Sequence, residues 1–168
     1  MQGDERRRAI LAELRGSKAP VSAAALAKKH AVSRQIIVGD VALLRAAGHE
    51  ILSTARGYVL PEAADGGITR RIAVRHSAAE TEAELNAIVD EGCTVLDVSV
   101  EHPVYGLLTG LLHIKSRYDV RVFLKKSAEA QPLSILTEGI HLHTLLCPDE
   151  AAFERVKDAL RTLGVLLE

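Results

Sequence analysis

The sequence has no tryptophan, only two phenylalanines and only two cysteines. With so few aromatic residues, a folded core must be built from leucine, valine, isoleucine and alanine, and the chain is 48% hydrophobic. Cys93 and Cys147 form no C-x-x-C pair. The sequence therefore predicts neither a zinc ribbon nor a disulfide framework.

Long apolar segments are also missing. No apolar run approaches the roughly 18 to 20 residues that a membrane-spanning helix requires, and the N-terminal segment lacks the apolar core of a signal peptide. We therefore expect a cytoplasmic protein that does not bind membranes. A chain of 168 residues is long enough for one good hydrophobic core or two small ones.

The net charge of −1 hides an asymmetry. Residues 1–60 contain ten lysines and arginines against five acidic residues, whereas residues 61–168 contain eleven against seventeen. A basic N-terminal part suggests that this end binds a polyanion. An imbalance of solvated charge without a function would give the same counts.

The first sixty residues show the pattern of a winged helix-turn-helix domain, which we assign to residues 1–61. Ser22 and Ser33 are the expected N-caps of the second and third helices. The expected elements are a helix over 4–15, a short helix from Ser22, a longer helix over 33–47 and a hairpin over 49–60.

This part resembles the winged-helix repressors of bacteria, among them the biotin-operon repressor. The segments that carry the resemblance are Ser33-Arg34-Gln35-Ile36-Ile37, Asp40-Val41, Leu44-Arg45 and Gly57-Tyr58. In such a domain the first turn of the third helix enters the major groove, so Arg34 and Gln35 are expected to read base edges. Gly39 departs from the pattern, because many relatives carry a side chain there that reaches DNA.

Phosphate contacts are expected from three further residues. Arg45 and the wing-tip Arg56 would position the domain on DNA without reading its sequence, and Ser33 would both cap the helix and touch a phosphate. The alternative is a three-helix module that binds another protein.

The pattern changes after residues 62–67, which are rich in alanine, glycine and acid and are interpreted as a linker. The expected elements beyond it are strands over 68–76, 94–100 and 104–114, helices over 79–90 and 119–130, a strand pair over 133–136 and 140–147 around Gly139, and a helix over 148–163. This βαββαββα order predicts an open α/β sandwich with antiparallel pairing, and an α+β chain overall.

His141 and His143 are separated by one residue in an apolar stretch. In a strand both imidazoles lie on the same face, as a metal site requires. A single histidine there is more often structural, but two buried imidazoles without partners would be costly. His76 and Glu84 could complete a site of three nitrogens and one oxygen. Glu80 is the substitute if Glu84 points elsewhere.

Residues 71–163 resemble the 3H domain. The segments that carry the resemblance include His76 with Glu84-Leu85, His102-Pro103-Val104-Tyr105-Gly106, Ser116-Arg117 and Gly139 with His141-Leu142-His143-Thr144. A winged helix followed by a 3H domain resembles the niacin-responsive transcription repressors of genes for NAD biosynthesis or niacin uptake. The resemblance implies that residues 68–168 form a regulatory domain folded like the histidine-containing phosphocarrier protein. It also implies a divalent transition metal at the four candidate ligands and nicotinic acid as co-repressor.

Three imidazoles and one carboxylate suit nickel, zinc or iron better than magnesium or calcium. The resemblance also makes His102, with Tyr105 beside it, a residue of the effector pocket. Arg117 is an obvious cation for the effector carboxylate, as is Arg75. A turn histidine and surface ion pairs are the alternative interpretations.

Such a metal site could instead activate water in a hydrolase. The sequence has no H-E-x-x-H or G-x-S-x-G segment, so we expect a regulator and not an enzyme. A repressor that senses the metal itself is the closer alternative. Operators with two-fold symmetry favour a homodimer joined through an apolar face of the second domain, but the sequence does not identify that face.

Overall fold

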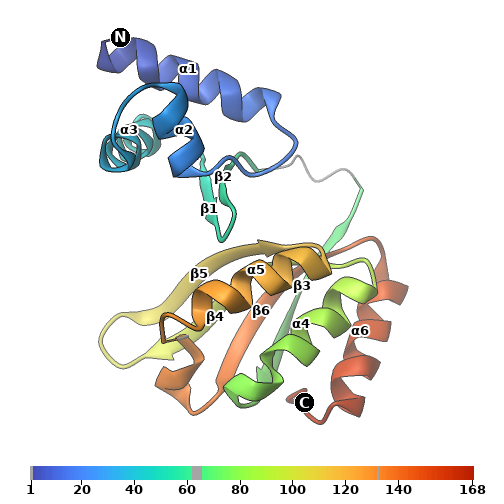
Figure 1. Cartoon of the computed structure of the whole chain (residues 1–168). Helices are drawn as coiled ribbons and strands as arrows, with labels where there is room; N and C mark the ends of the chain where they lie inside the picture. Colours follow the sequence, from blue (N-terminus) through green and yellow to red (C-terminus); the bar gives the residue numbers. More distant parts are fainter. Residues whose placement is uncertain (1, 62–65, 132) are drawn as a thin grey trace. The chain divides into compact units, whose positions relative to one another are not determined.

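The computed structural model describes residues 2–61, 66–131 and 133–168, in two compact units, Met1–Ala63 and Ala64–Glu168. Of the expected linker, residues 62–65 lie outside the described part of the chain. No described helix is long and apolar enough to cross a membrane. Figure 1 shows the N-terminal unit in blue to teal and the C-terminal unit in green to red.

The N-terminal unit has the helix-turn-helix and wing that the sequence predicts. Its elements are α1 (Gly3–Gly16), α2 (Ala23–Lys29), α3 (Arg34–Ala46), β1 (Leu52–Thr54) and β2 (Gly57–Val59). The hydroxyls of Ser22 and Ser33 accept hydrogen bonds from the backbone N–H of Ala25 and Ile36, so both act as N-caps. The hydrophobic core of this unit is built from aliphatic side chains.

A buried carboxylate joins α1 to α3. Asp40 is 3% exposed, and its carboxylate accepts hydrogen bonds from Arg6 at 2.6 Å and from Arg7 at 3.3 Å. Two of the basic residues counted in the N-terminal part therefore stabilise the helix packing. The basic excess overstates the charge that is available for a partner.

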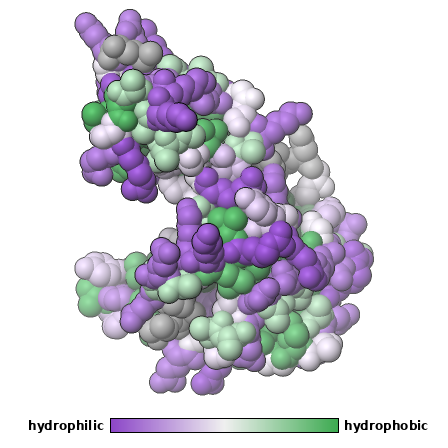
Figure 2. All heavy atoms as spheres, in the orientation of Figure 1, coloured by the Kyte–Doolittle hydropathy of each residue, from purple (hydrophilic) through white to green (hydrophobic). Residues whose placement is uncertain are grey.

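The C-terminal unit is an open sandwich with a four-stranded antiparallel sheet in the order β3-β6-β4-β5. Its elements are β3 (Ile68–Arg75), η1 (Ala78–Glu80), α4 (Thr81–Asp90), β4 (Thr94–His102), β5 (Gly106–Ile114), α5 (Arg117–Ser127), η2 (Leu133–Thr137), β6 (Ile140–Cys147) and α6 (Glu150–Thr162). Helices α4, α5 and α6 cover one face of the sheet (Figure 1), and the aliphatic core lies between them and the strands. On the outer side, hydrophilic side chains gather over α5 (Figure 2).

The expected strand over 133–136 is wrong, because this segment is the 3₁₀ helix η2. The order is therefore βαββαβα, and β6 lies between β3 and β4 and pairs with both. A short apolar run does not by itself distinguish a strand from a helical turn. Gly110 of β5 leaves room for the side chain of Leu133, whose Cδ1 would lie 3.4 Å from an added Cβ.

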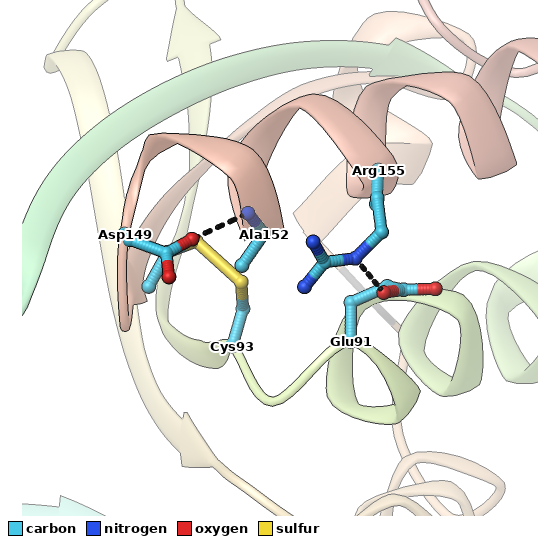
Figure 3. The surroundings of a disulfide bond; sticks show 6 residues. Glu91, Cys93, Asp149, Ala152 and Arg155 are labelled. Atoms are coloured by element: carbon cyan, nitrogen blue, oxygen red, sulfur yellow. Dashed lines mark hydrogen bonds and ion pairs between the residues drawn. A yellow bond between two sulfur atoms is a disulfide. The ribbon is translucent and has the colours of Figure 1, made fainter.

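Cys93 and Cys147 form a disulfide, which corrects the prediction that the sequence holds no disulfide framework. Thr94 pairs with Leu146 across β4 and β6, so the residues flanking this pair are brought together by the strand register. Figure 3 shows the disulfide beside the first turn of α6. The sequence pattern did not reveal the pair, because β4 and β6 are not consecutive strands.

Reduction of the disulfide is expected to lower the free energy of unfolding of the C-terminal unit by about 2–4 kcal/mol. The bond joins cysteines 54 residues apart, and cross-linking a loop of this size restricts the unfolded chain. Urea denaturation with and without a thiol reductant measures the change. The Cys93→Ala/Cys147→Ala double variant is the control and should not respond to the reductant. An unchanged midpoint for the wild type would refute the prediction.

Candidate metal centre and nucleic-acid interface

His141 and His143 lie on the helix-covered face of the sheet. Strand β6 alternates, so both point the same way, and they pair across the strands with Val74 and Ile72 of β3. They are 4% and 2% exposed. The alternation in the sequence predicts this shared face.

Glu84 reaches the histidines from the inner side of α4 and is only 1% exposed. Its Oε2 lies 2.6 Å from Nε2 of His76, the residue that follows β3. Its Oε1 lies 3.0 Å from Nε2 of His143 and 3.5 Å from Nε2 of His141. The ligand atoms of His76, Glu84 and His141 all lie within 4.8 Å of one another, and His143 joins them through its contact with Glu84. The structure thus brings all four predicted ligands together.

The other ring nitrogen of each histidine contacts a backbone carbonyl. Nδ1 lies 2.7 Å from the oxygen of Ser77 in His76, 2.8 Å from that of Gly139 in His141 and 2.7 Å from that of Asp97 in His143. A carbonyl oxygen only accepts hydrogen bonds, so each Nδ1 carries the proton and donates it. In the neutral rings Nε2 is then unprotonated, and its lone pair is directed at Glu84. Imidazoles that bind metals in proteins have the same arrangement, with one ring nitrogen on the metal and the other donating a hydrogen bond.

The buried carboxylate of Glu84 and the unprotonated Nε2 atoms that face it need a positive charge between them. Glu84 Oε1 and His143 Nε2 have no hydrogen-bond partner among the described residues, although they are 3.0 Å apart. Burial raises the pKa of Glu84, but the charge of His143 and the facing imidazoles of His141 and His76 outweigh it and hold that pKa well below its ordinary value. Burial lowers the pKa of His143 and of His76, but Glu84 raises both above the ordinary value. A proton or a metal cation can supply this charge, and three imidazoles with one carboxylate fit a transition metal.

The alternative ligand Glu80 has a different role. Its carboxylate accepts hydrogen bonds from the backbone N–H and the hydroxyl of Ser77, at 2.9 and 3.0 Å. It closes the turn that follows His76, whereas Glu84 points at the three histidines. The geometry therefore selects Glu84 as the carboxylate of the cluster.

Two positioning residues were not identified from the sequence. Gly139 has φ of +88° and approaches His76 so closely that an added Cβ would lie 2.3 Å from the carbonyl oxygen of His76. Asp97 holds His143 through its backbone carbonyl, and its carboxylate accepts a hydrogen bond from the N–H of Thr144. A glycine just before the His-x-His segment is the signal that could have revealed the first of these contacts.

The three candidate effector residues are not brought together. His102 and Tyr105 close the turn between β4 and β5, with Nδ1 of His102 accepting a hydrogen bond from the N–H of Tyr105 and ring centroids 4.9 Å apart. Arg117 follows the other end of β5, and its guanidinium forms an ion pair with Asp90. A nine-residue strand separates the two places by roughly 25 Å, which one small carboxylic acid cannot span.

Arg34 and Gln35 are exposed in the first turn of α3. Gly39, about one turn further along the same exposed side, would have nothing within 4 Å of an added Cβ. The hydroxyl of Ser33 caps the helix, and Arg56 lies half-buried in the wing.

The predicted phosphate ligand Arg45 is used within its own unit. Its Nε and Nη2 donate to the carbonyl oxygen of Ile51, and Nη2 also donates to the hydroxyl of Ser53, at distances of 2.7 to 2.9 Å. Arg45 thereby fastens the first strand of the wing to α3. Nη1 carries the two donors that remain for a phosphate.

Comparisons with known proteins agree with this two-part architecture. Residues 69–168 match the 3H domain family, and residues 6–59 match a family of HTH domains. The chain is 45% identical over 173 residues to the transcription repressor NadR of Bacillus subtilis (strain 168), covering 100% of this chain and 96% of that protein. It is 43% identical over 166 residues to the probable transcription repressor NiaR of Thermotoga maritima, covering 98% of this chain and 94% of that protein. The chain therefore belongs to the 3H-domain family of helix-turn-helix transcription repressors.

Proposed function

We propose that this protein is a cytoplasmic, homodimeric repressor of genes for NAD biosynthesis or niacin uptake, with nicotinic acid as co-repressor and a transition metal in the 3H domain. The observation that carries the proposal is the cluster of three Nε2 atoms around the buried carboxylate of Glu84. His76, Glu84, His141 and His143 would hold nickel, zinc or iron. The bound metal would supply a Lewis-acidic position for a pyridine nitrogen or a carboxylate.

The chain's own residues would prepare this site for the metal and the effector. The carbonyl groups of Ser77, Gly139 and Asp97 orient the three imidazoles. His102 and Tyr105 remain the effector candidates. Arg117, which follows the other end of β5, is a structural partner of Asp90 in this proposal.

Repression would require that nicotinic acid bind the DNA-competent arrangement more tightly than the inactive one. Equal binding to both arrangements leaves the equilibrium between them unchanged, however tight the binding is. Arg34 and Gln35 would read the operator, while Ser33, Arg56 and the free edge of Arg45 would contact phosphates.

Calorimetric titration of nicotinic acid tests the proposal directly. The full-length protein is titrated first loaded with nickel or zinc and then stripped with a chelator, at two temperatures. We expect binding heat only with the metal present. Absence of heat in every condition would refute nicotinic acid as the effector.

The same metal cluster favours a second candidate, a repressor that senses the metal itself. In that case the metal would exchange readily, and its removal would change operator affinity without nicotinic acid. A metal that survives dialysis against a chelator would contradict this candidate. A metal-dependent hydrolase is the weaker third alternative, because both relatives are named as repressors.

Substitution of Arg34 by alanine is expected to weaken operator binding by about 10- to 100-fold, since a bidentate contact to a base contributes about 1–3 kcal/mol. Fluorescence anisotropy with a duplex selected from a random library measures the change. Arg8, exposed on α1, is the matched control, and Arg8→Ala should change affinity far less. Equal effects of the two substitutions would contradict the role of α3 as the recognition helix.

A further inference from the structure

The C-terminal unit has one face of its sheet without a helix layer. In the described part of the chain, α4, α5 and α6 pack against the face that carries His141 and His143. Alternation along β6 therefore puts Ile140 and Leu142 on the opposite face, which we call the open sheet face. Ile140 is 42% exposed, although it is a large aliphatic residue.

Charge is arranged on the open sheet face in two parallel stripes. Arg71 and Arg75 lie on β3, opposite Thr144 and Ile140 of β6. On the other side of β6, Ser99 of β4 pairs with Leu142, and the same register places Glu101 opposite Ile140. Asp97 lies next to Thr144, whose N–H it binds. The face thus has arginines on β3, largely apolar residues on β6 and acids on β4.

These charges have few partners inside the unit. Arg71, Arg75 and Glu101 are exposed, and across residues 2–61, 66–131 and 133–168 the structure gives none of them a side-chain hydrogen bond or ion pair. Most other arginines of the C-terminal unit, such as Arg70, Arg117 and Arg155, do form ion pairs with nearby acids. Arg71, Arg75 and Glu101 are therefore available to a partner.

A second copy of the chain complements this pattern. If the two-fold axis lies along β6, in the plane between two stacked sheets, β3 of one protomer faces β4 of the other. Arg75 then meets Glu101 of the partner subunit, and Arg71 meets Asp97 of the partner subunit, while Ile140 and Leu142 pack on their own copies. Stacked sheets lie about 10 Å apart, a gap that arginine and glutamate side chains can bridge.

The size of the face permits such an interface. Four strands about 4.8 Å apart and about eight residues long give an area of roughly 20 Å by 25 Å per protomer, so two such faces bury about 1,000 Å² together, at the lower limit for a biological interface. Leu107 and Leu111 of β5 extend its apolar part and are 47% and 46% exposed. An acidic or basic partner would match only one of the two stripes, whereas a second copy matches both.

We propose that the open sheet face is the homodimer interface of this protein, with Arg75 of each protomer paired to Glu101 of the other. The inference rests on the proposed dimeric repressor and deepens it by naming the surface that joins the subunits.

A charge swap tests the interface in the full-length, metal-loaded protein. Sedimentation velocity over a range of micromolar concentrations measures the dimer dissociation constant. Arg75→Glu and Glu101→Arg each place like charges opposite one another twice, because of the two-fold symmetry. Each single substitution is expected to raise the dissociation constant at least about 10-fold. The double variant Arg75→Glu/Glu101→Arg restores opposite charges and is expected to return to near the wild-type value.

The controls separate a lost interface from a damaged fold. Lys125, exposed on α5, lies in the helix layer, so Lys125→Glu should leave the dimer unchanged. Metal content is measured for every variant, because Arg75 precedes His76. A monomeric wild type, single variants that remain dimeric, or a double variant that is not rescued would each overturn the inference. Metal-dependent heat with nicotinic acid in the same samples would show that the proposed response to nicotinic acid stands even where the interface does not.

Discussion

Glu84→Gln is expected to abolish tight metal binding, with a loss of affinity of at least about 100-fold. Glutamine has nearly the same shape as glutamate, so the space between α4 and β6 stays filled. The amide cannot offset the charge of a divalent cation or of the imidazoles, which all face this one side chain. Outer residues that merely orient a ligand already contribute about 10- to 100-fold, and Glu84 is placed as a ligand.

Metal content after exposure to a graded series of chelator concentrations measures this effect, and circular dichroism checks the fold. Glu80→Gln is the matched control, since Glu80 lies one turn earlier, is exposed and contacts only the turn at Ser77. We expect Glu80→Gln to keep its metal. Full occupancy of Glu84→Gln under the same challenge would exclude Glu84 from the ligand set.

Gly139→Ala is expected to weaken metal binding by about 10- to 100-fold and to lower the melting temperature of the C-terminal unit. The alanine Cβ would lie 2.3 Å from the carbonyl oxygen of His76, so the backbone must move. Two contacts converge on the Gly139 carbonyl, which accepts from the N–H of His76 and from Nδ1 of His141. Displacing it therefore disturbs two ligands together.

Gly164→Ala is the control that shows how much of the effect of Gly139→Ala comes from the positive φ alone, without a clash with another residue. Gly164 also has a positive φ, +73°, but an added Cβ there would meet nothing within 4 Å. This variant should lose only the roughly 1–2 kcal/mol of a left-handed alanine and keep its metal affinity. Equal metal affinities for Gly139→Ala and the wild type would contradict the positioning role of Gly139.

Local patterns predicted much of the site. Ser22 and Ser33 could be identified as N-caps, because a cap depends only on the next three residues. The shared face of His141 and His143 followed from the alternation of a strand. The family resemblance added His76 and Glu84, and the structure places all four side chains in contact.

Features that depend on pairing between distant segments were not predictable in this way. The disulfide between Cys93 and Cys147 exists because β6 pairs with β4 as well as with β3. Arg117 was expected to bind the effector carboxylate, but the packing of α5 on α4 places its guanidinium in an ion pair with Asp90. Arg45 was expected to contact a phosphate, but the wing folds back on α3, and the carbonyl oxygen of Ile51 and the hydroxyl of Ser53 accept hydrogen bonds from its guanidinium.

Apart from η2, the sequence by itself therefore determined which segments become helices and strands, which residues cap them and which side chains share a face, because these depend on neighbours within a few residues. Only the tertiary structure decided which strands lie side by side, which glutamate faces the histidines and which arginines are already paired. These features depend on strand order and helix packing. Both are set by contacts between residues far apart in the chain, which form only in the complete fold.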